Sequence, residues 1–270
     1  MKIPVVTGII RRRILLNYRL DPEVAARILP SNFRPKLVHG YAVAGICLIR
    51  LERIRPKGLP RFAGISSENS AHRIAVEWED DAGVAREGVF VPRRDTDSRL
   101  NSILGGRVFP GVQHYSEFRV TDLDGRIAMR IESSSGDVPL IDIEVEESEQ
   151  FPETSVFGSL ERSSRFFEAG CVGYSSRPDS CIMDGMLLKV PAWQVAPLFV
   201  HRIRSAYYDD ASIFPPGSIE FDHALLMRDI AHEWHSEPEM VAHPETVISE
   251  TDSARGTNQY PGEDNLHRPC

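Results

Sequence analysis

Lysine and cysteine are both scarce in this chain of 270 residues. Only four lysines occur, against 27 arginines, and the four cysteines contain no CxxC pair. Without such spacing the sequence predicts neither a zinc-binding motif nor a dense disulfide framework, and we expect reduced thiols in a reducing compartment. The lysines are Lys2, Lys36, Lys57 and Lys189, and the cysteines are Cys47, Cys171, Cys181 and Cys270.

Long apolar runs and a surplus of positive charge are absent as well. No uninterrupted stretch approaches the roughly 18 apolar residues of a membrane span. In the first residues, MKIPVVTGIIRRRILL, the arginines follow the short apolar run, which is the wrong order for a secretory signal. A formal net charge of -8 argues against nucleic-acid binding, since phosphate contacts need a surplus of Lys and Arg on one face. These absences predict a cytoplasmic protein with no membrane span and no nucleic-acid partner.

Motifs for several common chemistries are also missing. The chain has no GxSxG nucleophile elbow and no glycine-rich phosphate motif, so neither serine hydrolysis nor nucleotide chemistry is expected. In HEWH, residues 232–235, the two histidines stand three positions apart rather than four as in HExxH, and no third ligand is marked. We expect surface histidines beyond the last strand there, and neither a metal nor another cofactor.

Alternating apolar and polar residues, with turn residues between them, predict a chain made mostly of strands. Three short helices are expected: 21–29 with Asp21 as N-cap, 95–104 with Asp95 or Thr96 as cap, and 155–170 closed by Gly170. Strands do not alternate strictly with helices, so one α+β domain of mostly antiparallel sheet, curled into a barrel or sandwich, is favoured. The strands are predicted over residues 5–20, 41–55, 70–79, 84–93, 114–122, 126–134, 138–147, 184–190, 196–205 and 218–228.

The composition changes after residue 235. Residues 236–270 contain seven acidic residues, two arginines and few large apolar side chains. So little apolar surface cannot offset the entropy lost when a chain becomes ordered. The sequence therefore predicts one domain over residues 1–235 and an acidic, disordered tail over residues 236–270.

The segment GGRVFPGVQHYSEF, residues 105–118, places titratable groups beside a turn. Its two leading glycines indicate a backbone turn that side chains would obstruct. Arg107 fits either a bidentate pair with a bound carboxylate or a structural ion pair. His114 and Tyr115 are neighbours on a strand, so one faces inward and the other outward unless a bulge intervenes. From these residues alone, a half-buried histidine with satisfied hydrogen bonds is favoured over a catalytic one.

The same segment resembles the active-site strand of the acetoacetate decarboxylase family. Gly106 and Arg107 match the Gly-Arg of the family pattern with no gap. His114 and Tyr115 occupy the two columns that hold paired lysines in the family. The resemblance therefore places a ring nitrogen and a phenol where the family has amines.

Two further residues match the family. Arg11 stands before the element YRLD, and Glu68 lies among small polar residues in ISSENSAH, as the family's arginine and catalytic glutamate do. The resemblance covers roughly residues 10–120, and the rest is similar to uncharacterised bacterial proteins of the same superfamily. It implies a mostly antiparallel sheet forming a cone-like β-barrel around a pocket, with a few short peripheral helices, and it is compatible with a homo-oligomer.

The departure from the family concerns its chemistry. The decarboxylase uses a lysine amine to form a Schiff base with its ketone substrate, whereas imidazole and phenol cannot form an imine. The resemblance therefore implies a branch without the Schiff-base lysine, which binds a small oxo acid or similar carboxylate and acts by general acid/base chemistry. In this hypothesis His114, Glu68 and Tyr115 are catalytic, while Arg11 and Arg107 bind the ligand.

An enzyme is not the only function compatible with these residues. A lineage without the nucleophile can keep the barrel as a non-catalytic small-molecule binding module, since a fold does not by itself convey function. A third hypothesis is an interaction protein that uses the acidic tail as its contact. An enzyme would place His114 and Glu68 in one solvent-connected cavity with Arg11, whereas an interaction protein would fill that cavity with side chains.

Overall fold

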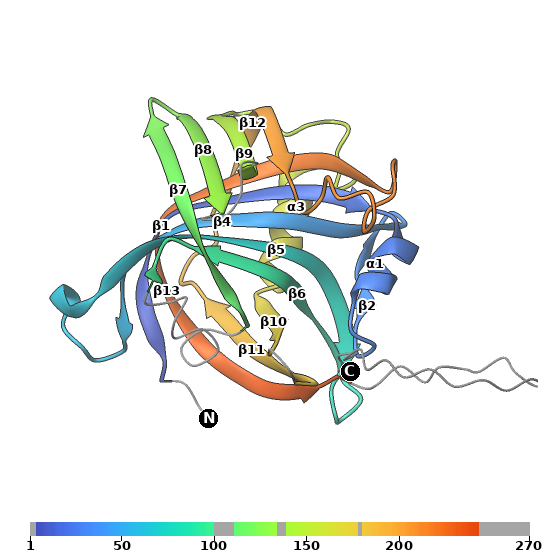
Figure 1. Cartoon of the computed structure of the whole chain (residues 1–270), viewed down its shortest axis with the longest axis horizontal. Helices are drawn as coiled ribbons and strands as arrows, with labels where there is room; N and C mark the ends of the chain where they lie inside the picture. The colour runs from blue at the N-terminus through green and yellow to red at the C-terminus, as the bar shows by residue number, and fades with distance from the viewer. Residues whose placement is uncertain (1–3, 100–110, 134–138, 178–179, 243–270) are drawn as a thin grey trace, which may run out of the picture.

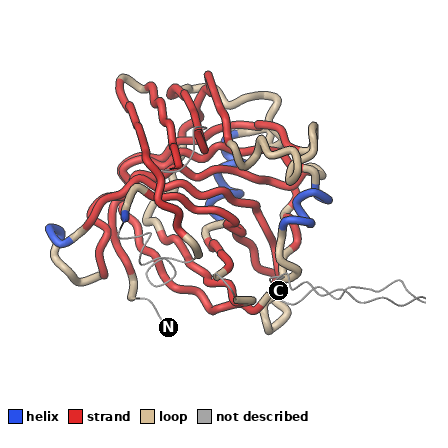
Figure 2. Tube along the Cα trace, in the orientation of Figure 1, coloured by secondary structure: helices blue, strands red, loops and turns tan. Residues whose placement is uncertain are grey.

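The computed structural model describes residues 4–99, 111–133, 139–177 and 180–242, and these residues form mostly strands. Among these residues, one strongly curved sheet of 13 strands carries two short α-helices, α1 (Pro22–Ile28) and α3 (Leu160–Ala169), and a single 3-10 turn, η1 (Arg61–Ala63), is also present (Figure 1, Figure 2). The strands are β1 (Val6–Leu20), β2 (Arg34–Pro35), β3 (Leu37–Val38), β4 (Tyr41–Pro56), β5 (Ile65–Glu79), β6 (Ala85–Thr96), β7 (Gln113–Leu123), β8 (Arg126–Ser133), β9 (Pro139–Glu147), β10 (Val172–Ser176), β11 (Ile182–Lys189), β12 (Ala196–Ser205) and β13 (Ile219–Val241).

Seven of these strands close into a ring. Antiparallel pairing runs from β13 to β1, from β1 to β4, from β4 to β5 and from β5 to β6. β6 then pairs in parallel with β10, β10 pairs with β11, and β11 returns to the far end of β13. We call β1, β4, β5, β6, β10, β11 and β13 the seven-strand ring. Closure leaves each of its strands hydrogen-bonded on both sides, which is how barrels avoid unpaired edges.

The other long strands bridge β6 and β13 on a second path. β7 pairs in parallel with β6, and β12 pairs antiparallel with β13. β7, β8, β9 and β12 are joined to one another by antiparallel ladders. β13 has 23 residues, so it is long enough to pair with β12 around Leu225 and with β11 from Glu233 onward. This one strand therefore belongs to both closed paths.

β1 shows how the sequence supplies both faces of a buried strand. Ile14 and Leu16 lie on one face and belong to the largest core cluster. Leu15 lies on the other face and packs with Phe157 and Phe167 at α3. Because both faces are covered, this part of β1 is a continuous apolar run instead of an alternating one.

Most of the elements predicted from the sequence are confirmed. Asp21 caps α1, with its Oδ1 accepting hydrogen bonds from the backbone N–H groups of Glu23 and Val24. α3 begins after Ser159, whose hydroxyl accepts a hydrogen bond from Arg162 N, and it is followed by Gly170. The mostly β fold with a curled sheet and short helices is confirmed, although the sheet is mixed and contains additional strands such as β10.

The predicted caps of a helix at residue 95 were wrong. Asp95 and Thr96 are the last residues of β6, where they pair with Ser70 and Asn69 of β5. Both are fully buried, and Asp95 accepts hydrogen bonds from two serine hydroxyls. Sheet pairing therefore extends over residues whose types also suit a helix start, which is a common way for tertiary structure to override a local preference. Residues 100–104 of the predicted helix lie outside the described residues.

The expectation of surface histidines beyond the last strand was also wrong. β13 continues through HEWH to Val241, past the boundary predicted at residue 235, because its second half pairs with β11. His223 and His232 both lie in β13 and are 1% and 2% exposed. Residues 243–270 of the predicted tail lie outside the described residues. Within the part of the chain that is described, no helix is long and apolar enough to cross a membrane.

Candidate functional site

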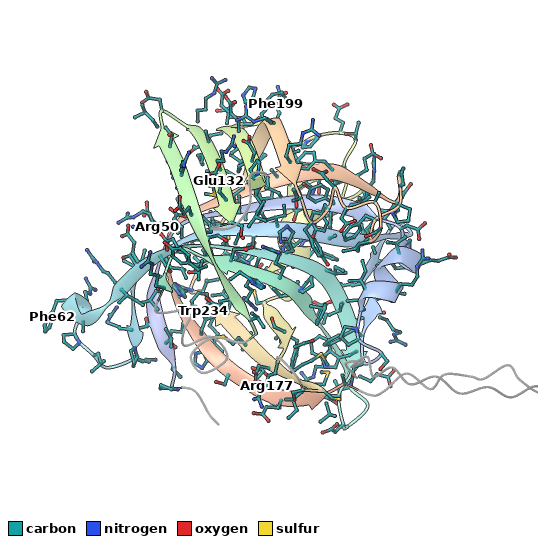
Figure 3. The ribbon with its side chains drawn as sticks, viewed as in Figure 1. Arg50, Phe62, Glu132, Arg177, Phe199 and Trp234 are labelled. Atoms are coloured by element: carbon teal, nitrogen blue, oxygen red, sulfur yellow. The ribbon has the colours of Figure 1, made fainter. Side chains whose placement is uncertain are left out.

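A cavity of about 150 Å³ lies within the seven-strand ring, and strands all around the ring contribute to its wall. The apolar part of the wall includes Ile49, Leu51, Val91, Leu188 and Trp234, the last of which is labelled in Figure 3. The polar part consists of Arg13, Cys47, Asn69, Ser70, Arg73, Arg94, Asp95, Gln113 and Cys171. An apolar pocket with a few convergent polar groups is typical of a small-molecule site.

Strand alternation explains why these side chains converge. Successive side chains of a strand point to opposite faces, so residues two apart share a face. On β5, Asn69 and Arg73 share the inward face, and on β4 Cys47 lies two residues before Ile49. The cavity is therefore a consequence of the inward faces of paired strands and not of a loop.

Arg73 is the most deeply buried of the three cavity arginines. Arg73 is 6% exposed, and its guanidinium lies over the Phe167 ring, with 4.6 Å between Cζ and the ring centroid. Nη2 donates a hydrogen bond of 2.6 Å to Oδ1 of Asn17, and Nε has no hydrogen-bond partner. Part of the donor capacity of this guanidinium is therefore free to meet a ligand.

The other two arginines make neutral contacts. Nε and Nη2 of Arg94 both donate to the hydroxyl of Ser175, at 3.2 and 3.1 Å. Nε of Arg13 donates to Sγ of Cys47 at 3.3 Å, and its guanidinium lies 5.5 Å from the Trp193 ring centroid. Within the described residues, none of the three arginines forms an ion pair with a carboxylate. Asp95, the one carboxylate among the described wall residues, pairs with Arg93 instead, so the three arginines have no carboxylate partner in the wall.

Burial changes the acidity of these groups without removing their charge. It lowers the pKa of both Arg73 and Arg94 to about 10. For Arg73 the neighbouring Arg13 lowers the pKa further, whereas Cys47 acts in the opposite direction. A guanidinium with a pKa of about 10 is still cationic near pH 7, and attraction between charges is strengthened where water is excluded.

A buried hydrogen-bond network holds the side chain of Arg73 in position. Asn17, which accepts the hydrogen bond from Arg73, directs its Nδ2 at Nε2 of His223 over 3.1 Å. Nε2 also lies 2.7 Å from the hydroxyl of Ser163, and Nδ1 lies 2.6 Å from Oδ2 of Asp222. Since a carboxylate can only accept, Nδ1 carries the proton and Nε2 accepts from the other two groups. Burial lowers the pKa of His223, opposed by the hydrogen bond to Asp222, and the network ties α3 to β1 and β13.

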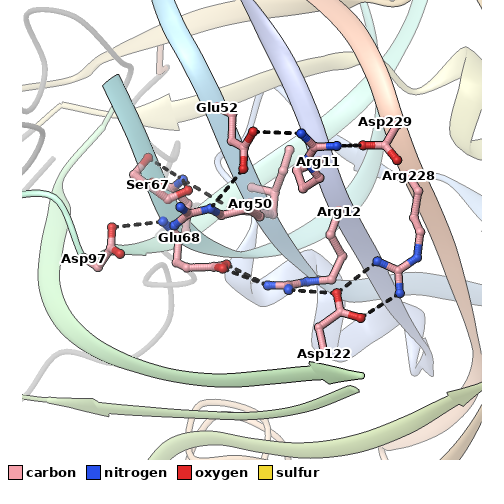
Figure 4. A network of polar contacts seen from close by, with 12 residues as sticks. Arg11, Arg12, Arg50, Glu52, Ser67, Glu68, Asp97, Asp122, Arg228 and Asp229 are labelled. Atoms are coloured by element: carbon pink, nitrogen blue, oxygen red, sulfur yellow. Dashed lines mark hydrogen bonds and ion pairs between the residues drawn. The ribbon is translucent and has the colours of Figure 1, made fainter. Parts of the chain in front are cut away.

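Arg11 and Glu68, two of the residues predicted from the sequence, belong to a different group of charges (Figure 4). Arg11 is exposed and donates hydrogen bonds to Glu52 and Asp229. Glu68 is buried, and both of its carboxylate oxygens accept hydrogen bonds from Nη2 of Arg12, at 2.9 and 2.8 Å. Burial raises the pKa of Glu68, and Arg12 opposes that shift. Neither Arg11 nor Glu68 is part of the cavity wall.

Two further predicted residues, His114 and Tyr115, lie at the start of β7. His114 is exposed and pairs with Asp95 of β6, while Tyr115 is half-buried, with the Arg99 guanidinium 5.3 Å from its ring centroid. Gln113, the residue before them, does line the cavity. Arg107 lies outside the described residues. The structure therefore does not bring His114, Tyr115, Glu68 and Arg11 to one cavity, and the roles assigned to them stay predictions.

The family resemblance indicated Arg11, but Arg11 lies at a β-bulge and Arg13 lines the cavity instead. The register of β1 against β4 shifts between Ile10 and Arg12, so one extra residue of β1 is accommodated there. Arg11 is exposed at this shift, whereas Arg13 follows it and lines the cavity. The run of three arginines was visible in the sequence, but which of them faces inward depends on the bulge.

Metal binding has little support in the described part of the chain. No group of three or more His, Cys, Asp or Glu side chains there is placed to hold a metal ion. His232 has no hydrogen-bond partner on either ring nitrogen, but it lies beside Trp234, with 4.6 Å between the ring centroids. The polar groups of the described cavity wall are guanidinium, amide, hydroxyl, thiol and one carboxylate.

Comparison with families of known sequence gives one clear match. A family model with the description "Uncharacterized conserved protein" matches residues 9–183, which is more than half of the chain. A search of curated proteins found no match.

Several solved structures share the fold. An acetoacetate decarboxylase from Legionella pneumophila has a TM-score of 0.57 at 12% identity, over 88% of each chain. The enduracididine biosynthesis enzyme MppR, complexed with pyruvate, has a TM-score of 0.53 at 12% identity, over 88% of this chain and 90% of its own. An acetoacetate decarboxylase-like enzyme from Sphingomonas wittichii RW1 has a TM-score of 0.54 at 11% identity, over 88% and 91%. At these identities the likeness confirms the predicted decarboxylase-like fold.

Proposed function

This chain belongs to the DUF2071 family, and from that premise we propose that it binds a small carboxylate, of the size of a short oxo acid, inside the seven-strand ring. The observation that carries the proposal is the cavity wall, in which Arg13, Arg73 and Arg94 converge without a carboxylate partner among the described residues. A buried charge that lacks a counter-charge is costly. A bound carboxylate would supply that counter-charge, and guanidinium groups match its geometry.

The size of the cavity and the structural relatives support the same class of ligand. A volume of about 150 Å³ suits a molecule with a few carbon atoms. MppR, which has the same fold, was solved with pyruvate and also with a condensation product of pyruvate and imidazole 4-carboxaldehyde. The apolar end of such a ligand would meet apolar wall residues such as Leu51 and Leu188.

The proposed site does not use a Schiff base between a lysine and the ligand. No lysine is among the described residues that line the cavity. Lys36 pairs with Glu87, Lys57 pairs with Glu233, and Lys189 is exposed at the end of β11. A Schiff base needs a primary amine within reach of the bound carbonyl, so this placement favours binding or a different covalent step. General acid/base catalysis by His114, Glu68 and Tyr115 stays a prediction, because none of them lines the cavity.

Thermal unfolding with a matched pair of ligands tests the proposal. Pyruvate and pyruvamide have the same carbon skeleton, but only pyruvate carries a negative charge near pH 7. A ligand at 100 times its dissociation constant adds about 2.7 kcal/mol to the free energy of unfolding. We expect pyruvate or acetoacetate to stabilise the protein and pyruvamide to have little effect. Equal stabilisation by pyruvate and pyruvamide would contradict a site built for a carboxylate.

A further inference from the structure

Cys47 lines the same cavity as Arg13, Arg73 and Arg94. It is in the middle of β4, between Leu15 of β1 and Ala71 of β5, and its thiol is free. Its Sγ accepts a hydrogen bond from Nε of Arg13 at 3.3 Å. It is also close enough to Arg73 and Arg94 for its charge to raise the pKa of both guanidiniums. Cys47 is half-buried and lines the cavity, so a ligand in the cavity reaches it.

Cations are the nearest charged neighbours of the Cys47 sulfur that the cavity wall provides. The thiolate, and not the thiol, is the nucleophile, and adjacent cations stabilise it. Here the cations have no carboxylate partner among the described residues that would cancel their effect. Independent evidence for a ligand comes from Arg73, which is 6% exposed, lines the same cavity and leaves its Nε without a partner. A bound anion and the sulfur of Cys47 would therefore be neighbours.

Cys171 provides a built-in comparison, because it lines the same cavity. Its Sγ donates a hydrogen bond to the backbone oxygen of Glu168 at 2.9 Å. Burial raises the pKa of Cys171, and Arg13 opposes this shift without cancelling it. The two free thiols of the cavity thus have opposite environments: one accepts from a guanidinium, and the other donates to a carbonyl.

We propose that Cys47 is a nucleophile that adds reversibly to the carbonyl carbon of an oxo acid whose carboxylate is held by the arginines. This inference rests on the proposed carboxylate site. In the step, a bond forms between Sγ and the carbonyl carbon, and the π electrons of the carbonyl move to its oxygen. That oxygen takes up one proton, equivalent to the one the thiol gave up, so the product is a thiohemiketal and no oxidant or reductant is needed. The reverse step returns the free ligand.

The reactivity of the two thiols in the unmodified protein gives the first test. Iodoacetate and iodoacetamide deliver the same carbon and lose the same iodide, but only iodoacetate is an anion. We expect Cys47 to be alkylated faster by iodoacetate than by iodoacetamide, by roughly tenfold, since a cationic site concentrates anionic reagents. Cys171 should react slowly with both. Peptide mass spectrometry reads both sites in the same sample, so no variant has to fold. A preference for iodoacetamide at Cys47, or equal rates at the two cysteines, overturns the inference.

The second test separates covalent addition from binding alone. Carbon-13 NMR of pyruvate labelled at the carbonyl carbon distinguishes a ketone from a tetrahedral carbon. We expect a protein-bound tetrahedral signal, distinct from that of free pyruvate hydrate, with the native protein and with Cys171→Ser, and its loss in Cys47→Ser. Calorimetry on Cys47→Ser should still show pyruvate binding, since the arginines are intact. Binding with only a ketone signal in the native protein refutes the addition and leaves the carboxylate site standing. Failure of pyruvate and acetoacetate to bind at all refutes both proposals.

Discussion

At the scale of single residues, buried polar side chains determine the chemistry of the cavity. Arg73 shows the balance: a guanidinium that is almost fully buried is retained by one hydrogen bond to Asn17 and by contact with the Phe167 ring. Neither contact is an ion pair, so the charge remains available for a ligand. In the sequence, the only signal for Arg73 is a charged residue next to the apolar run IAV in the segment HRIAV. This signal does not show whether the side chain of Arg73 faces a cavity.

Removing the acceptor that holds Arg73 should weaken both the fold and the site. In Asn17→Leu the guanidinium loses its 2.6 Å hydrogen bond, and Nε2 of His223 loses one donor. Leaving buried polar groups without partners costs about 1–3 kcal/mol each. We expect urea denaturation to show a loss of this size, together with weaker pyruvate binding. Unchanged stability would mean that the network does not position Arg73.

His232, one of two buried histidines in β13, should make the protein sensitive to acid. Burial lowers the pKa of His232 to about 4, with a further lowering from Arg13, whereas an unfolded chain has a histidine pKa of about 6.5. Between these values the unfolded state binds a proton and the folded state does not, so stability falls as the pH falls from about 6.5 to about 4. His72, whose pKa burial also lowers to about 4, adds to the same trend.

His232→Phe isolates the contribution of that one ring. The replacement keeps an aromatic group beside Trp234 and removes the titration. The native protein should lose roughly 3 kcal/mol more than the variant between pH 6.5 and 4, from a shift of about 2.5 units at about 1.4 kcal/mol per unit. The measurement is the free energy of unfolding across this pH range. Parallel pH profiles for the two proteins would show that His232 is protonated in the folded state.

At the scale of elements, local sequence patterns predicted most of the strands and helices but not how the strands close into a ring. The predicted β7–β8 hairpin forms around Asp124 and Gly125, which both have positive φ, at 51° and 77°, as a tight hairpin turn requires. β10 was missed, since VGYSS is short and lacks a clear alternation. Its parallel pairing with Val89 and Phe90 joins segments far apart in sequence, so no local pattern indicates it. The ring, and with it the cavity, depends on that pairing.

Two glycines at this pairing should differ in their tolerance of a side chain. A Cβ at Gly88 would lie 2.4 Å from the backbone oxygen of Val172, which would push β10 away from β6. A Cβ at Gly173 would meet its neighbours at an ordinary 3.5 Å. We expect Gly88→Ala to cost about 1–3 kcal/mol, as overpacking usually does, and Gly173→Ala to cost less. Urea denaturation checks this, and equal losses would contradict the close approach of the two strands.

At the scale of the whole molecule, two closed paths of strands share β1, β4, β5, β6 and β13. One path surrounds the cavity, and the other encloses much of the apolar core. The chain is acidic as a whole, with a formal charge of -8, while the cavity concentrates arginines. Overall charge therefore excluded nucleic acid from the sequence-based hypotheses but could not reveal a local cationic site. The homo-oligomer implied by the family resemblance stays a prediction.

Closure of the ring by the second half of β13 can be tested by truncation. A chain that ends at residue 235 loses the pairs that join Ser236, Glu237, Met240 and Val241 to β11, whereas one that ends at residue 242 keeps them. We expect the shorter chain to unfold at a lower temperature and to lose stabilisation by pyruvate, because the cavity wall opens. Identical melting of the two chains would show that β13 is not needed for closure.

The most direct test of the central claim is a calorimetric titration of pyruvate into the native protein and into single arginine variants. The account predicts that Arg13→Gln and Arg94→Gln each weaken the affinity at least tenfold, since a hydrogen bond to a charged group is worth about 1.5–3 kcal/mol. Arg19→Gln, which removes a surface partner of Glu220, should leave the affinity unchanged. If the cavity variants bind pyruvate as tightly as the native protein, or if only Arg11→Gln loses binding, the carboxylate site is not inside the seven-strand ring.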